Sequence, residues 1–226
     1  MEFFLDNQEI ESQYQEILKE INLLMNGEIH QEMKDYGLQY EKSLGASIIS
    51  LRQLASKYDM NHLLAQKLWC KAYRETRILA TLLEEPEKVT GEQIDRWMGE
   101  LESPEMIEQI SMNLFCKIPG IMETVVNWIG FPEEKFRWAA LLITGRRAML
   151  GMDVQEEVFS DFLSKLPLEI FPGYYQKTLC RNLGKIARKS ERLRKQIIAL
   201  LQERRNNDSA WMEVAQEMKY ELDAAL

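Results

Sequence analysis

The chain has 226 residues, 46% of them apolar and 28% charged, a balance typical of a folded protein rather than a disordered one. No apolar run approaches the roughly 20 residues that a membrane-spanning helix needs. The first residues also lack the basic start of a secretory signal. We therefore expect a cytoplasmic protein with no membrane-spanning segment.

Metal sites and cofactors are not expected. The chain has only two histidines, His30 and His62, and no HExxH or CxxC spacing. The three cysteines, Cys70, Cys116 and Cys180, are far apart in apolar helical stretches, so we predict reduced core thiols. The five tryptophans lie mostly on apolar faces and are predicted to be packing residues.

Apolar residues recur at spacings of three and four along nearly the whole chain, which is the period of an amphipathic helix. Thr90 with Gln93 and Asp153 with Glu156 match the capping box, and many of the other segments also begin at a helix-start signal. The predicted helices span residues 8–26, 29–36, 46–57, 60–72, 74–84, 91–100, 104–117, 120–129, 133–149, 154–164, 173–188, 191–205 and 209–223.

The short connections between these segments predict antiparallel neighbouring helices, which bury their apolar faces by stacking pair upon pair. The predicted fold class is therefore all-α, a HEAT-like superhelical solenoid of antiparallel helix pairs. We expect it to form a single domain over residues 1–226, with the helices of residues 1–44 the least clearly marked. A compact, irregular helical domain is the alternative, because no self-similar repeat is evident. The absence of strand patterns and glycine-rich loops excludes nucleotide-binding α/β folds.

Charge is distributed unevenly along the chain. Residues 1–134 carry 12 Lys or Arg against 24 Asp or Glu, whereas residues 135–226 carry 16 against 12. Five cations recur at spacings of four, four, three and four, which aligns them on one face if the helix is unbroken. They are Lys177, Arg181, Lys185, Arg188 and Arg192.

A break near Ser190 would rotate Arg192 away from this face. Arg146 and Arg147, at the end of an earlier helix, are candidates to join the same surface. Cations at helical spacing suit phosphates and predict salt-dependent binding of nucleic acid. The alternatives are a solvated face that balances the acidic half of the chain, or a dimer contact.

Several stretches distributed over the chain carry a family resemblance, densest over residues 44–118 and traceable to about residue 190. They are Leu51-Arg52-Gln53-Leu54-Ala55, Leu68-Trp69, residues 75–83 (ETRILATLL), Asp95-Arg96-Trp97 and residues 107–115 (IEQISMNLF). In these residues the chain resembles the AlkD-like family of bacterial DNA alkylation repair proteins. The resemblance implies a HEAT-like solenoid that carries DNA on its concave face and, in active members, hydrolytic release of N3- or N7-alkylated purines.

The resemblance also implies which residues would act. In active members a Trp opens the central helix, and an Asp four residues later stabilises positive charge in the transition state. Here Pro104 stands at the Trp position and Glu108 at the Asp position, which moves the carboxylate about one methylene outward. A displacement of that size can cost about a hundredfold in rate. A second Trp is replaced by Arg181, and the place of a phosphate-contacting Arg falls at Trp138, with Arg137 beside it.

Three hypotheses follow from the sequence. The first is a divergent AlkD-like protein that binds DNA through backbone contacts on a basic concave surface, with glycosylase activity weak or lost. The second is an active alkylpurine glycosylase that uses Glu108 as its carboxylate. The third is a scaffold that binds a protein partner, because helical solenoids often present their concave surfaces to other proteins.

Overall fold

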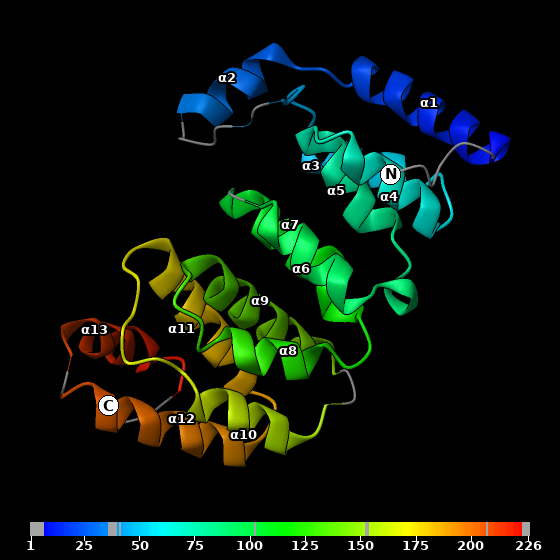
Figure 1. Cartoon of the computed structure of the whole chain (residues 1–226). Helices are drawn as coiled ribbons and strands as arrows, with labels where there is room; N and C mark the ends of the chain where they lie inside the picture. The colour runs from blue at the N-terminus through cyan, green and yellow to red at the C-terminus, as the bar shows by residue number, and fades with distance from the viewer. Residues whose placement is uncertain are drawn as a thin grey trace. The chain divides into compact units, whose positions relative to one another are not determined.

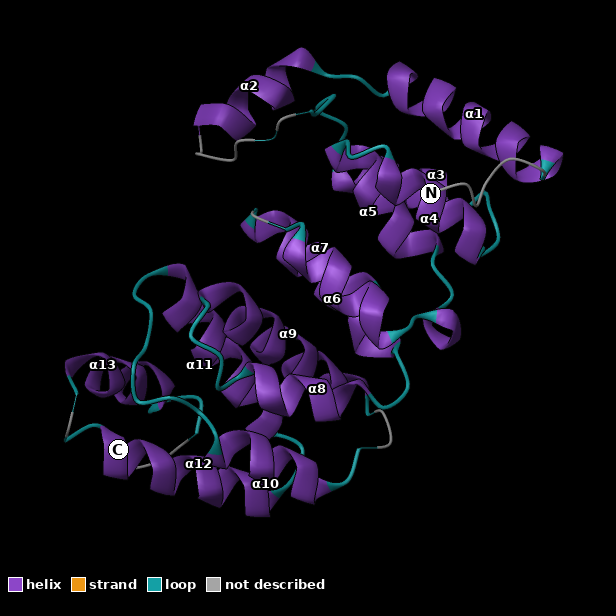
Figure 2. Cartoon of the chain, viewed as in Figure 1, coloured by secondary structure: helices purple, strands orange, loops and turns teal. Residues whose placement is uncertain are grey.

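The structure, a computed structural model, describes residues 7–35, 40, 42–101, 103–151, 154–206 and 208–222. Every regular element within these ranges is a helix, which confirms the all-helical prediction (Figure 2). The chain divides into two compact units, residues 1–119 and 120–226, and each is described by itself. The predicted single domain stays a prediction. None of the described helices is long and apolar enough to cross a membrane.

The first unit packs its helices mainly around α5, which contacts α4, α3 and α7 (Figure 1). Side-chain oxygens of Asn7, Ser47, Asn61 and Thr90 accept backbone N–H groups at four of the helix starts, as expected for good N-cap residues. The described elements are α1 (Gln8–Leu23), α2 (Gly27–Asp35), α3 (Ile48–Ala55), α4 (His62–Cys70), α5 (Arg74–Leu83), the 3₁₀ turn η1 (Pro86–Lys88), α6 (Gly91–Gly99), α7 (Pro104–Asn113) and the 3₁₀ turn η2 (Phe115–Lys117).

Two indole rings stack in the core of this unit. Trp69 from α4 and Trp97 from α6 lie with ring centroids 3.9 Å apart and planes within 2° of parallel. Trp69 Nε1 donates to Glu100 Oε2 at 2.8 Å, and the Arg77 guanidinium lies 5.1 Å from the Trp69 ring while pairing with Glu100 at 2.9 Å. The pair therefore joins α4, α5 and α6 in one cluster, which is a packing role.

The second unit has α9 at its centre, where it packs along α11 and also contacts α8 (Figure 1). Residues 137–145 of α9 are all buried, so this helix is covered on every side over that length. Ser190 and Asp208, which directly precede the predicted helices 191–205 and 209–223, cap α12 and α13 with their side chains, whereas Asp153 lies outside the described residues. The described helices are α8 (Ile121–Trp128), α9 (Glu134–Leu150), α10 (Glu156–Ser164), α11 (Tyr174–Ala187), α12 (Glu191–Arg204) and α13 (Ser209–Met218).

Two sequence predictions about the core have different outcomes. All five tryptophans are buried, which confirms the prediction that they are packing residues. Cys116 and Cys180 are buried and form no disulfide within the described residues, as predicted. Cys70 is also a free thiol, but its predicted place in the core is wrong: it is exposed, because it is the last residue of α4, where the helix leaves the core.

Candidate nucleic-acid interface

The crossing of α9 and α11 positions the candidate interface. Gly145 of α9 lies against Asn182 of α11 so closely that a Cβ on the glycine would be 2.0 Å from Asn182 Oδ1 and 2.8 Å from Asn182 Cβ. The buried Asn182 side chain donates to Thr178 O at 2.8 Å and accepts from Lys185 Nζ at 3.0 Å. Because Gly145 has no side chain, Asn182 fits against α9 and accepts the hydrogen bond of Lys185.

Gly145→Ala is expected to lower the free energy of unfolding by about 1–3 kcal/mol, because the buried Asn182 must shift to accommodate the methyl group. Gly184→Ala on α11 is the matched control. There the added Cβ would meet only the carboxylate end of Glu221, a flexible side chain that can move aside. Urea unfolding of both variants checks this, and equal destabilisation of the two would contradict it.

We name Arg146, Lys177, Arg181 and Lys185 the cationic cluster. Lys185 is half-buried, and this burial, together with the positive charges of Arg146, Arg181 and Arg188, lowers the pKa of its ammonium group. Arg146 comes from α9 and the other three members from one face of α11. Within the described part of the chain, none of the four forms an ion pair with an acid, and Arg146 Nε is buried with no hydrogen-bond partner. The cluster therefore concentrates positive charge that no direct ion pair among the described residues neutralises.

The next two predicted cations are paired with acids. Arg188, just after the last residue of α11, forms an ion pair with Glu221. Arg192 pairs with Glu157 at 2.7 Å. It belongs to α12 and not to α11, because α11 ends at Ala187 and Ser190 caps a new helix. Arg192 is thus not in line with the cations of α11, as the break near Ser190 implied.

Three further predicted residues are buried. Arg137 and Arg147 are each 7% exposed and Trp138 is 5% exposed. Arg137 Nε donates to the carbonyl of Phe131, and the guanidinium lies 5.1 Å from the Phe171 ring. Trp138 meets the exposed Tyr174 edge to face, with ring centroids 5.0 Å apart. In this structure these side chains pack the second unit rather than cover its surface.

The candidate carboxylate belongs to the first unit. Glu108 lies in the middle of α7 and is half-buried, beside the buried Met106, Ile107 and Ile110 of the same helix. Pro104 opens α7, as predicted, and is exposed. The aromatic side chain that the resemblance would place at this helix start is therefore absent, and nothing else in the first turn of α7 supplies a ring.

An ion pair that the sequence analysis did not find occupies the start of α7. The Arg74 guanidinium donates two hydrogen bonds to the Glu105 carboxylate, from Nε to Oε2 at 2.8 Å and from Nη2 to Oε1 at 2.6 Å. The Tyr40 hydroxyl also donates to Glu105 and lies 2.7 Å from Ser103 Oγ. Burial raises the pKa of the Glu105 carboxyl, but the bonds and charge of Arg74 outweigh this and leave the pKa below its usual value. Glu105 is therefore committed to a structural pair.

The same arginine reaches a second buried carboxylate. Arg74 Nη1 donates to Glu75 Oε1 at 3.1 Å and to the carbonyl of Ala46 at 2.8 Å. Glu75 also accepts the backbone N–H groups of Leu44, Gly45 and Ala46, at 3.0 to 3.3 Å. These bonds fasten the segment before α3 to the start of α5. The Arg-Glu sequence at 74–75 was the available signal, but its partners lie about 30 residues away on either side.

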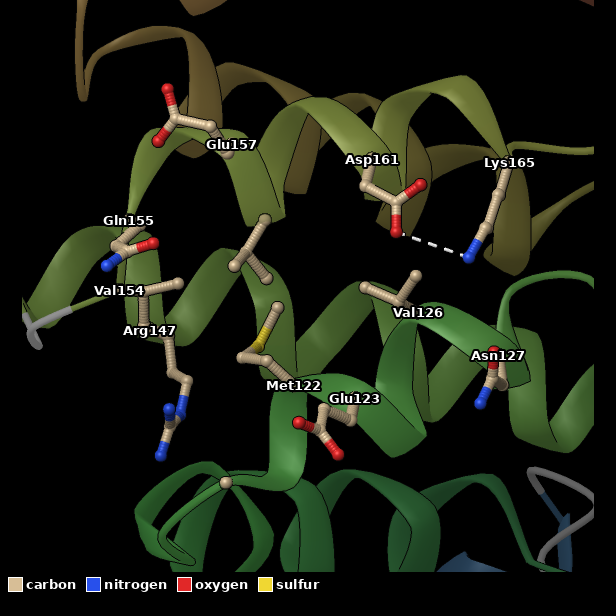
Figure 3. A pocket seen from close by; sticks show the side chains of 12 residues that line it. Met122, Glu123, Val126, Asn127, Arg147, Val154, Gln155, Glu157, Asp161 and Lys165 are labelled. Carbon is tan, nitrogen blue, oxygen red and sulfur yellow. Dashed lines mark hydrogen bonds and ion pairs between the residues drawn. The ribbon is translucent and has the colours of Figure 1, made fainter.

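The second unit also contains a cavity of about 670 Å³ between α8 and α10 (Figure 3). Met122 and Val126 supply apolar surface from α8, while the rim carries both acids and bases. Asp161 and Lys165 on that rim pair with each other at 3.2 Å. Because its charges are of both signs, this cavity lacks the one-sided positive field that phosphates need.

Comparisons with known proteins agree with this architecture. The family model described as "DNA alkylation repair enzyme" matches residues 17–157. One solved structure is similar with a TM-score of 0.70 at 15% sequence identity, and the match covers 92% of this chain and 94% of the chain in that structure. It is described as "A new family of proteins related to the HEAT-like repeat DNA glycosylases with affinity for branched DNA structures". The search of curated proteins finds no match.

The structural match confirms the HEAT-like helical fold that the sequence predicts. The match to the family model extends over more than half of the chain and includes both α5 and α7, whose residues carry the Arg74 network. It ends within α10, before the helix that provides most of the cationic cluster. The chain therefore belongs to the DNA alkylation repair enzyme family.

Proposed function

We propose that this protein holds DNA by its sugar–phosphate backbone through the cationic cluster, with glycosylase activity weak or lost. The observation that carries the proposal is that Lys185 and two of the cations that lower its pKa, Arg146 and Arg181, form no ion pair with an acid among the described residues. A bound phosphate would relieve the mutual repulsion of these groups and restore the pKa of Lys185 toward its usual value. Arginine and lysine at helical spacing read backbone position rather than base sequence.

Two comparisons support DNA as the partner. The family is one of DNA alkylation repair enzymes, and the structural neighbour is described as belonging to a family related to the HEAT-like repeat DNA glycosylases, with affinity for branched DNA structures. We extend that affinity to this chain as part of the proposal. Branched DNA is a reasonable ligand for a surface that recognises backbone, because its arms present phosphates in several directions.

Weak or absent glycosylase activity is proposed from the residues of α7. Pro104 supplies no aromatic ring at the helix start, and Glu105 is held by Arg74 and Tyr40. Glu108 is left as the carboxylate nearest to the position that the resemblance implies. It carries the required charge, but on a longer side chain than the family's Asp.

DNA binding across a salt series tests the proposal. Fluorescence anisotropy with labelled duplex and four-way-junction DNA, from about 50 to about 300 mM salt, should show affinity that falls linearly with the logarithm of salt concentration. A protein that binds neither DNA, or binds with no dependence on salt, would contradict backbone recognition.

The second candidate function is an active alkylpurine glycosylase, favoured by the family match and by the half-buried carboxylate of Glu108 on α7. Incubation with methylated DNA and chromatography of the released bases decides between the two. Release of 3-methyladenine or 7-methylguanine by the wild type above the level of Glu108→Gln would establish the enzyme. Equal release by both proteins would leave DNA binding as the function.

A further inference from the structure

A line of glutamates runs beside the cationic cluster on the helix packed next to it. Glu213, Glu217 and Glu221 are four residues apart, so they lie on one side of α13 and the turn that follows it. We name these three residues the acidic line. Because α13 packs against α11, this side faces the helix that provides most of the cationic cluster.

The three members of the acidic line contact three successive turns of α11, at residues 176, 180 and 184. Glu213 Oε2 accepts from Gln176 Nε2 at 3.1 Å. The Glu217 carboxylate is hydrogen-bonded to the Cys180 thiol and, after burial, is a major reason why the pKa of that thiol is raised to about 12. The Glu221 carboxylate lies over Gly184, within 2.1 Å of where a Cβ would be.

The contacted positions and the cationic positions are neighbouring rows of the same helix. Residues 176, 180 and 184 face the acidic line, while 177, 181 and 185 belong to the cationic cluster, one residue further around α11. One residue turns an α-helix by about 100°. Positive charge and negative charge therefore border each other along three turns of α11.

Two members of the line keep their charge uncompensated. Glu221 is neutralised by Arg188, whereas Glu213 and Glu217 form no ion pair with a cation in the described part of the chain. Uncompensated carboxylates repel phosphates within about one Debye length, roughly 8 Å at physiological salt. Glu213 and Glu217 contact Gln176 and Cys180, each of which is next in sequence to a member of the cationic cluster.

We infer that the acidic line is a specificity element that closes the α13 side of the cationic cluster to phosphates, so that one DNA backbone enters from the α9 side, where Arg146 lies. This inference rests on the proposed function. It assigns to Glu213 and Glu217 the role of limiting how many phosphates the surface holds. Negative charge beside a binding surface is a known means of rejecting wrong arrangements of a ligand.

The double variant Glu213→Gln/Glu217→Gln tests the inference, because glutamine keeps the size of each side chain and removes its charge. In duplex binding at about 50 mM salt we expect affinity to rise about three- to tenfold, with a steeper salt slope because additional phosphates are engaged. The matched control is Glu123→Gln/Asp161→Asn. It makes the same change in net charge on α8 and α10, which border the separate cavity.

The outcomes separate the two proposals. If the wild-type protein binds DNA and the double variant Glu213→Gln/Glu217→Gln has the same affinity and the same salt slope, the inference alone is overturned. An equal gain in both double variants also overturns it, since net charge would then explain the effect. Wild-type protein without measurable affinity for either DNA overturns the proposed function and the inference together. Thermal melting of Glu213→Gln/Glu217→Gln near the wild-type midpoint shows that the fold is retained.

Discussion

Reversing the charge at Lys177, Arg181 and Lys185 together is expected to weaken binding of duplex and branched DNA by at least about a hundredfold at roughly 0.1 M salt. On the proposed function, each reversal would remove one phosphate contact and add a repulsion at the same place. Three such changes of about 1 kcal/mol each, or more, give a loss of this size. The salt slope should fall in parallel, since fewer counterions are released from the DNA. The variant Lys177→Glu/Arg181→Glu/Lys185→Glu is measured by anisotropy against the wild type.

A matched reversal elsewhere in the second unit is the control for that experiment. Lys165, Lys195 and Lys219 are exposed and lie on or next to α10, α12 and α13, and Lys165→Glu/Lys195→Glu/Lys219→Glu changes the net charge by the same amount. This control should lose much less affinity. A similar loss in both triple variants would show that net charge, and not the cationic cluster, governs binding.

Replacing Arg74 with methionine is expected to lower the free energy of unfolding by about 3–5 kcal/mol, because the buried Glu75 and the half-buried Glu105 would be left without their cation. Arg74 is 2% exposed and donates to both carboxylates and to the carbonyl of Ala46. Methionine fills much of the same volume, so the loss reports the unpaired charges rather than a cavity. Urea unfolding followed by circular dichroism measures it.

Removing the partner charge as well should recover part of this loss. In Arg74→Met/Glu105→Met only Glu75 stays charged, and it retains three backbone N–H donors. The pH dependence gives a second test. Because the pKa of Glu105 is lowered in the folded protein, its stabilising contribution is present above the unfolded pKa and is lost as pH falls through the folded value. Wild-type stability should therefore fall more steeply in acid than that of the double variant; a double variant no more stable than Arg74→Met would contradict this account.

The helices were predictable because their information is local. The apolar spacing and the start signals at Thr90, Ser190 and Asp208 place the observed helices within a few residues of their predicted bounds. Ser103 directly precedes Pro104 and is of a residue type that often caps a helix, but its hydroxyl bonds to Tyr40 instead of capping α7. Even at a helix start, a partner 63 residues away in sequence can decide what a side chain does.

The candidate site was less predictable because it depends on pairing between distant elements. The spacing of Lys177, Arg181 and Lys185 on one face could be read from the sequence. The pairing of Arg188 with Glu221 and of Arg192 with Glu157 could not, since each joins residues more than 30 positions apart. The five regularly spaced cations therefore predict a larger positive surface than the fold presents, because two of them are paired with acids.

Burial removed other candidates for a different reason. Trp138 lies on a helix that is covered over much of its length, so neighbouring positions differ little in their apolar pattern, and sequence periodicity gives no outward face to read. The acidic residues at 213, 217 and 221 were visible at a spacing of four. Their significance depends on the packing of α13 against α11, which local pattern does not specify.

The parallel rings of Trp69 and Trp97 have a spectroscopic consequence. Two indoles whose centroids are 3.9 Å apart and whose planes are nearly parallel are close enough for their excited states to couple, and that coupling is lost when the rings separate. Both chromophores belong to residues 1–119, so their signal reports on that unit alone, while Trp128, Trp138 and Trp211 report on residues 120–226. The protein therefore carries its own optical label for following the melting of its two halves independently, without any attached dye.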